Sequence, residues 1–442
     1  MTILTGAVSF DYLYVMRSLF IILFSLGIFQ GPLMAQKLRK SKLEKIIASQ
    51  PGFQGAQVAV AVQRLGESKL RAQRQESHYM TPASNTKLLT FLAVHSQLPA
   101  LPVLTYALDS LQQTHFQATG YPVLLHPFYP DDQALSFLNT QNQLIYHRAV
   151  QQIPRLGPGW SWDDFSYYYS APPSAFPIYG NVTQLIRTET NSLKVTPTFP
   201  TRPVTDAPYA AKRMEFENQF TFNLEKIAVG DSLYRPFLPS DSLFAQLLGE
   251  AIGQKVTYVE EPFVGAMDTL FVNDPKTIYR ALLQDSDNLV AESLMLMVGQ
   301  KLTDTLSVNK GIAAMQTKWA SWLPDPLEWV DGSGVSRYNM VTPRTLVAVL
   351  QKIHQQLGLS GIARYLPQGG HSGTLKAYNF GPGLTVYAKT GTLRHNHNLS
   401  GYFQGKKGHW YAFSVMVNHY TAPTAEIRQG IAAILKACYA KL

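Results

Sequence analysis

The sequence predicts a mixed α/β fold in which a single domain is split by a β-rich insertion. Helix-like and strand-like hydrophobic patterns occur together in residues 36–105 and again in residues 240–442. Residues 106–239 differ, because they contain many Pro, Tyr, Thr and Asn residues and several short strand-like runs. We therefore expect the two parts of the split domain at 36–105 and 240–442, with one or two inserted β-rich domains at 106–239.

The two parts of the split domain contain clear element patterns. Residues 37–49 have the spacing of a helix, residues 57–63 form a compact strand-like run, and a buried helix begins near Ser84. A Gly-Lys-Lys-Gly hairpin turn is expected at 405–408, and a C-terminal helix begins at Ala425. The other predicted helices are 241–252, 275–284 and 289–298, and the other predicted strands are 385–388, 399–404 and 410–418.

The composition excludes several classes of protein. The 442 residues are 46% hydrophobic and 15% charged, which excludes a disordered chain and permits a large buried core. The net charge of +9 is dispersed without a long basic run, so it indicates anionic envelope or polymer surroundings rather than nucleic acid binding. The single cysteine, Cys438, excludes an intrachain disulfide and a zinc site built from CxxC pairs.

The first 35 residues have the pattern of a secretory signal peptide. Arg17 precedes an apolar run at 18–29, and small residues end the segment at Ala35. The run is too short to span a bilayer comfortably, and no later segment approaches 18 consecutive apolar residues. We expect an exported, periplasmic or envelope-associated protein that is cut near Ala35, with residues 1–15 an over-extended start. A buried N-terminal helix is the alternative.

The first candidate motif is S-x-x-K within the sequence Pro-Ala-Ser-Asn-Thr-Lys. Three residues along a helix place Ser84 and Lys87 on one face, so the amine can reach the hydroxyl. Such a lysine acts as a general base only when it is neutral, which requires burial or a nearby cation. Ser307 and Lys310 have the same spacing, so the motif alone also fits a helix start with a solvated lysine.

The second candidate motif is the Asp-Ser-Asp-Asn sequence at residues 285–288. Ser286 and Asn288 are two positions apart, so their side chains project to the same side of an extended or loop-like segment. An Asx-rich turn that caps the following helix is the alternative interpretation.

The third candidate motif is Lys389-Thr390-Gly391-Thr392, which follows a strand-like run. On a strand Lys389 and Gly391 share a face, so a cation stands beside a position without a side chain and a substrate backbone can lie close. An edge-strand lysine before a turn is the alternative interpretation.

The three motifs in this order are the signature of penicillin-binding proteins and class A β-lactamases. The chain most closely resembles the low-molecular-mass class C penicillin-binding proteins, which are D-alanyl-D-alanine carboxypeptidases and endopeptidases of the serine S13 type. The long segment between Lys87 and Ser286 exceeds what a compact β-lactamase needs. Further segments that carry the resemblance are GWSWDD (159–164), SAPPSA (170–175), DGSGVSRYN (331–339), GTL (373–375) and NLSGY (398–402).

The resemblance implies a fold and a mechanism. The fold is a β-lactamase/transpeptidase-like sandwich with a five-stranded antiparallel sheet between helices, interrupted by one or two β-rich domains. Ser84 would form an acyl-enzyme with D-alanyl peptides, and Lys87 would be its general base. Ser286 would pass a proton to the leaving amine, and Asn288 would orient Lys87 and the substrate amide. Lys389 would bind the terminal carboxylate as a point charge.

The resemblance also implies that the K-T-G segment binds substrate. Thr390, Gly391 and Thr392 would lie along the bound peptide. The backbone N–H groups of Ser84 and Thr392 would form the oxyanion hole.

Three charged residues are weaker candidates for substrate binding. Asp164 matches an acidic residue that reaches the amine of the diamino acid in the stem peptide, with a turn or capping role as the alternative. Arg337 matches a family arginine near the substrate, with a structural role in its turn as the alternative. Arg394 stands where some relatives carry a neutral polar residue, so recognition of the substrate side chain can differ.

The expected partners are peptidoglycan stem peptides, and β-lactam antibiotics as covalent inhibitors. No cofactor or metal is expected, because His395 and His397 lack a third ligand at a convincing spacing. The aromatic residues Trp160, Trp162 and 167–169 are expected in the core of the inserted part, and stacking on sugar rings is the alternative.

Two rival functions remain at this point. One is a β-lactamase or esterase on the same scaffold, and the other is a catalytically silent protein that binds the cell wall. The sequence leaves open whether carboxypeptidase or endopeptidase activity dominates, which diamino acid the stem peptide contains and how many subunits assemble.

Overall fold

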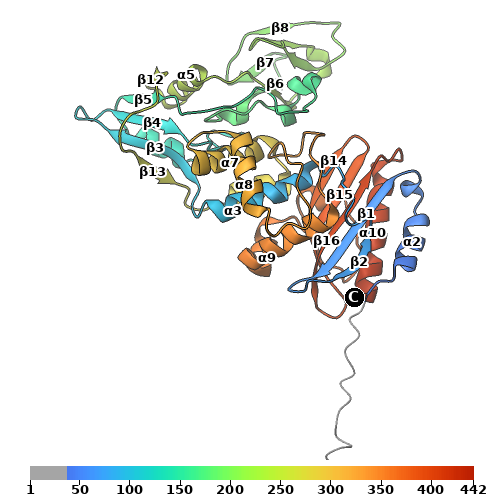
Figure 1. Cartoon of the computed structure of the whole chain (residues 1–442). Coiled ribbons are helices and arrows are strands. Elements are labelled where there is room, and N and C mark those ends of the chain that lie inside the picture. The colour runs from blue at the N-terminus through green and yellow to red at the C-terminus, as the bar shows by residue number, and fades with distance from the viewer. Residues whose placement is uncertain (1–36) are drawn as a thin grey trace, which may run out of the picture. The chain divides into compact units, whose positions relative to one another are not determined.

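The computed structural model describes residues 37–442, so the predicted signal peptide at residues 1–35 lies outside the described residues. The central element is an antiparallel five-stranded sheet with the strand order β14-β15-β16-β1-β2 (Figure 1). Its strands are β1 (Gln57–Arg64), β2 (Leu70–Arg74), β14 (Val386–Leu393), β15 (Asn396–Gln404) and β16 (Trp410–Asn418). Segments from the two ends of the described chain therefore meet in one sheet.

Helices cover both faces of this sheet (Figure 1). Helices α2 (Lys40–Ala48) and α10 (Thr424–Lys441) pack on one face, and α3 (Lys87–Gln97) and α9 (Pro343–Tyr365) lie on the other. Strand β1 contributes to both cores, because its alternating valines and alanines point to opposite faces. Because β1 is buried on both faces, its residues form the continuous apolar run from which the strand was predicted.

Helix α7 (Asn288–Thr303) packs beside α3, and α8 (Val308–Trp319) packs against α7; both contribute to the same core. Helix α6 (Lys276–Arg280) continues into a π-helical turn, η7 (Ala281–Asp285). The remaining single turns are η1 (Pro51–Phe53), η2 (Ala83–Thr86), η3 (Trp162–Ser166), η4 (Tyr168–Ser170), η5 (Tyr179–Asn181), η6 (Leu224–Lys226) and η8 (Gly373–Leu375).

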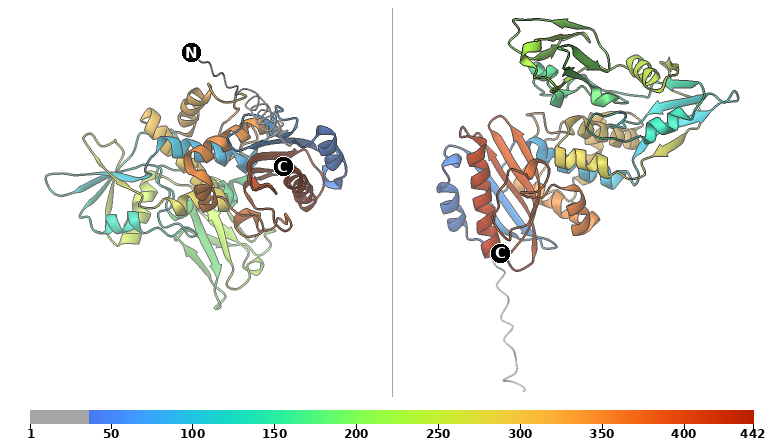
Figure 2. Two further views of the ribbon diagram at one scale, coloured as in Figure 1. Left: turned by 90° about the horizontal axis from the view of Figure 1, so that it is seen from below. Right: turned by 180° about the vertical axis from the view of Figure 1, so that it is seen from behind.

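The segment between α3 and α6 forms three further sheets (Figure 2). A mixed five-stranded sheet has the order β12-β5-β4-β3-β13, and two three-stranded sheets have the orders β11-β6-β7 and β8-β10-β9. The two helices of this segment are α4 (Gln133–Asn139) and α5 (Asp241–Ile252). The strands are β3 (Pro102–Leu108), β4 (Thr114–Ala118), β5 (Leu144–His147), β6 (Val182–Arg187), β7 (Leu193–Thr196), β8 (Thr201–Pro203), β9 (Ala211–Arg213), β10 (Phe220–Phe222), β11 (Ser232–Pro236), β12 (Val256–Val259) and β13 (Asp268–Phe271).

Strands β12 and β13 follow residue 239, the predicted end of the insertion. They nevertheless pair with β5 and β3, so one sheet uses residues from both sides of that position. The domain limits themselves stay a prediction.

Most of the predicted elements are present. The predictions for β1, α5, β16 and α10 agree with the structure to within a residue or two. Strands β14 and β15 are longer than predicted, because the polar residues that follow Ala388 continue to pair with residues 396–398. Helices α8 and α9 were not predicted.

The turn before Ser84 is tied to the central sheet by buried side chains. Asn398 Nδ2 on β15 donates to the carbonyl oxygens of Thr81 and Pro82, each at 2.9 Å. Asn85 Nδ2 donates to Ser400 Oγ at 2.8 Å. Because buried polar groups without partners are costly, these bonds fix the turn against the sheet.

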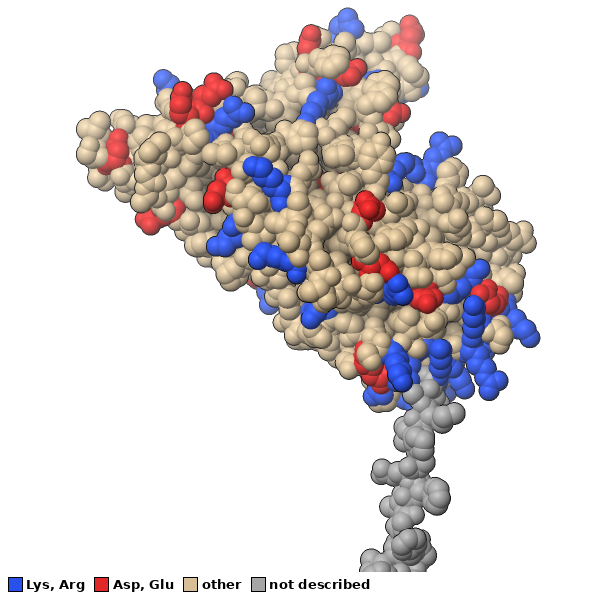
Figure 3. Space-filling model, in the orientation of Figure 1, with Lys and Arg blue, Asp and Glu red and all other residues tan. Residues whose placement is uncertain are grey.

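The surface charge is dispersed, as the sequence predicts. Figure 3 shows Lys and Arg side chains interspersed with Asp and Glu over most of the face in view, with more Lys and Arg at its lower right end. The basic residues of α2 are exposed lysines. Among residues 37–442, no helix is long and apolar enough to cross a membrane.

Candidate active site

The S-x-x-K motif forms the turn η2 and the start of α3. Ala83 has a φ of +49°, a left-handed conformation that sets the direction of the chain just before Ser84. Lys87 Nζ lies 3.1 Å from Ser84 Oγ, as the helical spacing predicts. Lys87 is completely buried, so the alternative of a solvated lysine is wrong.

Two further oxygen atoms surround the Lys87 amine. Its Nζ donates to Asn288 Oδ1 at 2.7 Å and to the carbonyl oxygen of Ser333 at 2.7 Å. Burial lowers the pKa of Lys87 to about 8, against the opposing effect of nearby carboxylates. The sequence alone did not indicate the contact with Ser333.

The second motif is placed by an unusual helix start. Ser286, which has a φ of +65°, directly follows the π-helical turn η7, and Asp287 then caps α7 by accepting from the backbone N–H of Val290 at 2.9 Å. The two interpretations of this motif therefore apply to different residues. Asp287 is the cap, and Ser286 and Asn288 project toward the two lysines.

Lys389 on β14 is the second buried amine of the site. Its Nζ donates to Ser286 Oγ at 2.8 Å and to the carbonyl oxygen of Thr390 at 2.9 Å. Burial lowers the pKa of Lys389 well below its ordinary value, and the nearby Lys87 lowers it further. The three motifs thus converge in one cluster.

Gly391 brings β14 against the nucleophile turn. A Cβ atom at this position would lie 2.3 Å from the carbonyl oxygen of Pro82, so no other residue fits without displacing the turn. The missing side chain therefore makes room for η2. The space that a Gly391 side chain would need is thus filled by η2, and a substrate-binding role for the Gly391 backbone stays a prediction.

The free edge of β14 presents Thr390 and Thr392. The backbone N–H of Ala388 donates to Pro367 on the outer side, and Val386 accepts from Gly369 there. Backbone groups of alternate residues face the same side of a strand, so those of Thr390 and Thr392 face the same outer edge. The predicted oxyanion donor on Thr392 is compatible with this direction.

Side chains behind β14 support the K-T-G segment. Thr392 Oγ1 lies 2.7 Å from His397 Nδ1, and His397 Nε2 lies 2.6 Å from the Tyr378 hydroxyl. Burial lowers the pKa of His397 to about 4, so this ring is neutral at neutral pH. Thr390 Oγ1 donates to Thr374 Oγ1 at 2.8 Å.

The His395-Asn396-His397 sequence does not gather metal ligands. His395 Nδ1 lies 2.9 Å from the carbonyl oxygen of Tyr420, whereas His397 contacts Thr392 and Tyr378. Within the described part of the chain, no group of three His, Cys, Asp or Glu side chains is positioned to hold a metal ion.

Glu292 is a site residue that was not predicted. It lies one turn after Asn288 on α7 and accepts from the backbone N–H groups of Ser333 at 2.8 Å and Gly332 at 3.1 Å. These bonds hold the loop whose Ser333 carbonyl contacts Lys87. Burial raises the pKa of Glu292 to about 7. An acidic residue four positions after Asn288 in an apolar helix was the available signal.

Asp331 links this loop to the inserted segment. Its carboxylate accepts from the backbone N–H groups of Gly334 and Ser336 at 2.8 and 2.6 Å, and from Asn339 Nδ2 at 2.7 Å. Trp160 Nε1 also donates to it at 2.9 Å. A residue of the predicted insertion thereby completes the network behind Lys87.

The three weaker candidates lie outside the lysine cluster. Asp164 accepts from the Tyr169 hydroxyl at 2.9 Å, and the Tyr169 carbonyl accepts from Asn288 Nδ2 at 2.8 Å. Asp164 is therefore linked to Asn288 of the site through Tyr169. Arg337 and Arg394 are exposed, and their roles stay predictions.

The predicted burial of the aromatic cluster is mostly wrong. Trp160 is buried, but Trp162 and the three tyrosines at 167–169 are exposed. The short turns η3 and η4 hold these side chains on the surface, where the inserted segment approaches α7.

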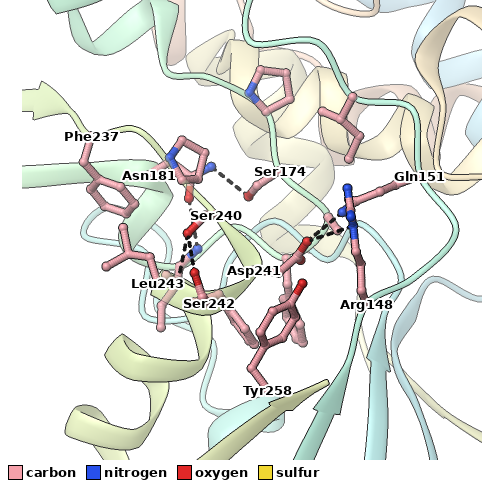
Figure 4. A pocket seen from close by; sticks show the side chains of 17 residues that line it. Arg148, Gln151, Ser174, Asn181, Phe237, Ser240, Asp241, Ser242, Leu243 and Tyr258 are labelled. Carbon is pink, nitrogen blue, oxygen red and sulfur yellow. Dashed lines mark hydrogen bonds and ion pairs between the residues drawn. The ribbon is translucent and has the colours of Figure 1, made fainter. Parts of the chain in front are cut away.

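A separate cavity of about 360 Å³ lies beside α5 (Figure 4). The Asp241 carboxylate in this cavity already has two partners. Gln151 Nε2 donates to Asp241 Oδ2 at 2.7 Å, and Arg148 Nε lies 3.5 Å from the same oxygen. Of the described residues that line it, none belongs to the three motifs. We therefore do not assign this cavity to the catalytic site.

Sequence comparison decides the family. A sequence model of the D-Ala-D-Ala carboxypeptidase 3 (S13) family matches residues 39–101 and 243–438, more than half of the chain. The chain belongs to the S13 family. All three motifs lie within the residues that the family model matches.

Two curated proteins illustrate the similarity. The chain is 22% identical over 426 residues to the D-alanyl-D-alanine carboxypeptidase DacB of Haemophilus influenzae, covering 84% of this chain and 88% of the relative. It is 30% identical over 171 residues to the carboxypeptidase DacB of Mycolicibacterium smegmatis, covering 36% of this chain and 37% of the relative.

Solved structures confirm the predicted fold. The chain is similar to the crystal structure of penicillin-binding protein 4 (DacB) from H. influenzae, with a TM-score of 0.71, 20% identity and coverage of 90% of this chain and 98% of that one. A predatory peptidoglycan endopeptidase from Bdellovibrio bacteriovorus is also similar, with a TM-score of 0.52, 13% identity and coverage of 87% and 92%.

The lowered pKa of Lys87 predicts how acylation depends on pH. A lysine with a pKa of about 8 is about one-tenth neutral at pH 7, and the neutral fraction rises as the pH increases. We expect the rate constant for acylation of this S13 protein by a fluorescent penicillin to increase with pH through a midpoint near 8. The Lys310→Ala variant is the matched control and should give the same profile. A flat profile between pH 6 and pH 9 would contradict the account.

Replacement of Glu292 tests its positioning role. In Glu292→Gln the amide has one acceptor oxygen, so one of the two loop N–H groups loses its partner. We expect penicillin acylation to slow by about 10- to 100-fold through misplacement of Lys87. Loss of the negative charge also lowers the pKa of Lys87, so the midpoint of the pH profile should move to lower pH.

Glu250→Gln on the exposed face of α5 is the control for this substitution. It should change neither the rate nor the midpoint. An unchanged midpoint in Glu292→Gln would show that the buried carboxylate has no influence on Lys87.

Proposed function

We propose that this protein is a serine-type D-Ala-D-Ala carboxypeptidase that acts on peptidoglycan stem peptides through an acyl-enzyme at Ser84. The observation that carries the proposal is the buried Lys87 amine 3.1 Å from Ser84 Oγ, in a member of the S13 family. The same centre would cleave D-alanyl cross-links, since both reactions break a peptide bond after D-alanine.

The contacts of Lys87 support its role as general base. A neutral amine has two N–H donors and one lone pair. The oxygens of Asn288 and Ser333 can only accept, so they take the two N–H groups. The lone pair is then left for the hydroxyl proton of Ser84. As Ser84 Oγ bonds to the substrate carbonyl carbon, this proton moves to Lys87.

Ser286 and Lys389 are proposed to protonate the leaving amine. Ser286 Oγ gives its proton to the amine of the departing D-alanine and is reprotonated through the Lys389 amine, 2.8 Å away. Water then adds to the acyl carbonyl carbon, and one of its protons replaces the proton drawn from Lys389. As the ester bond to Ser84 Oγ breaks, Lys87 returns its proton to Ser84. We propose that the backbone N–H groups of Ser84 and Thr392 bind the developing oxyanion.

We propose that Lys389 binds the substrate carboxylate. Burial lowers the pKa of Lys389 well below its ordinary value, which favours the neutral amine before substrate binds. A bound carboxylate raises the pKa of a neighbouring amine. Binding of the carboxylate would therefore favour protonation of Lys389, and Thr390 and Gly391 would lie along the peptide.

We also propose substrate-binding roles for the three peripheral charges. Asp164 is held near the site through Tyr169, where its carboxylate is suited to the amine of a diamino acid. Arg337 and Arg394 are exposed and carry charge suited to carboxylates of a stem peptide.

We propose that the protein works outside the cytoplasm, where its substrate is found. The signal-like pattern of residues 1–35 supports export to the periplasm or envelope. β-Lactam antibiotics are proposed as covalent inhibitors that acylate Ser84. A structure of the H. influenzae penicillin-binding protein 4 in complex with a β-lactam is similar to this chain, with a TM-score of 0.66 and 20% identity over 90% of this chain and 99% of that one.

Digestion of purified muropeptides tests the proposed reaction. The wild-type protein should release free D-alanine from pentapeptides, and split cross-links if it is also an endopeptidase, as mass spectrometry detects. Ser84→Ala should lose both products, because among residues 37–442 Ser84 supplies the hydroxyl hydrogen-bonded to the Lys87 amine. Ser307→Ala in the second S-x-x-K sequence is the matched control and should keep both activities.

A fluorescent penicillin separates the rival functions in the same preparation. A stable adduct supports the carboxypeptidase. Rapid turnover of the drug without release of D-alanine would indicate a β-lactamase, and neither adduct nor product would indicate a silent scaffold.

A further inference from the structure

The inserted segment exposes a set of large aromatic rings. The exposed fractions are 67% for Trp162, 53% for Tyr167, 51% for Tyr168, 42% for Phe128 and 38% for Tyr169. We call these five residues the aromatic platform. Single exposed aromatic residues need no explanation, but a group of neighbouring ones indicates a binding surface.

Four of the five rings, those of Phe128, Tyr167, Tyr168 and Tyr169, are in contact with one another. Tyr167 and Tyr169 stack with their ring centroids 5.5 Å apart and their planes at 4°. Tyr168 meets Tyr169 edge to face at 6.3 Å and Phe128 at 6.5 Å. The hydroxyl of Tyr169 donates to Asp164, which fixes its ring. A preformed surface of this kind loses little conformational entropy when a ligand binds.

The aromatic platform is continuous with the catalytic site. The Tyr169 carbonyl accepts from Asn288 Nδ2 at 2.8 Å, and Asn288 also contacts Lys87. Tyr168, Tyr169 and Phe128 line a small cavity together with Ser286 and Asn288. The rings of Tyr168, Tyr169 and Phe128 therefore lie beside two residues of the second motif.

Polar groups between the rings restrict the chemistry of the ligand. Asp163 is exposed beside Trp162, and the tyrosine rings carry hydroxyl groups at their edges. Flat apolar ring faces with carboxylates and hydroxyls at the rim suit sugars. The C–H groups of a sugar pack on the negatively charged face of an aromatic ring, and its hydroxyls bond to the polar rim.

We propose that the aromatic platform binds sugar rings of the peptidoglycan glycan strand that carries the stem peptide. This inference rests on the proposed function, because the stem peptide is what brings the glycan to this surface. The platform then holds substrates that are still attached to the wall in preference to free peptides. The alternative occupant of the aromatic platform is a protein partner. In that case the enzyme would not distinguish substrates that carry the sugar from free peptides.

The test compares two substrates that differ only in the sugar. One is a disaccharide pentapeptide, N-acetylglucosaminyl-N-acetylmuramyl-pentapeptide, and the other is the sugar-free pentapeptide of the same sequence. The wild-type protein should have the higher kcat/KM for the disaccharide pentapeptide. In the double variant Trp162→Ala/Tyr167→Ala, we expect the ratio of the two kcat/KM values to fall by about tenfold. Phe271→Ala, an exposed ring on β13, is the matched control and should leave the ratio unchanged.

The outcomes separate this inference from the proposed function. If the wild-type protein hydrolyses both pentapeptides and the double variant keeps the wild-type ratio, the aromatic platform does not bind sugar. If both kcat/KM values fall equally, the rings serve the peptide or the fold, which also overturns the inference. Failure of the wild-type protein to hydrolyse either pentapeptide or to bind penicillin would instead refute the proposed function. Penicillin labelling of the double variant at the wild-type rate confirms that its active site is folded.

Discussion

The complete burial of the Lys87 amine is the constraint on which the rest of the site depends. An ammonium group without water is costly, so the amine must either lose its proton or find oxygen partners. Both happen here, since the pKa falls to about 8 and three oxygens lie within hydrogen-bond distance. The oxygens of Asn288 and Ser333 lie 201 and 246 positions from Lys87 in the sequence, so the complete environment of the base forms only when both parts of the split domain come together.

The surroundings of Lys87 are held by a second set of buried carboxylates. Glu292 and Asp331 accept from backbone N–H groups of one loop, and that loop presents the Ser333 carbonyl to the amine. Trp160 donates to Asp331, and Tyr169 accepts from Asn288. The segment between α3 and α6 therefore contributes to the geometry of the catalytic centre as well as to the surface around it.

The motifs were predictable from the sequence where local spacing decides geometry. One turn of helix places Lys87 beside Ser84, and alternation along β14 places Lys389 and Gly391 on one face. Glu292 and Ser333 were not predictable, because their contacts join residues about 40 positions apart through a loop. The exposure of Tyr167 was also missed, since aromatic content alone does not distinguish a core from a surface.

The most direct test of this account is the protonation of Lys87 itself. An NMR titration of protein labelled with ¹³C-lysine, with Lys87 assigned from the signal missing in Lys87→Arg, measures the pKa of the side chain. The account predicts a midpoint near pH 8. A midpoint close to the ordinary lysine value of about 10.4 would contradict it, because the amine would then carry a proton throughout the working range.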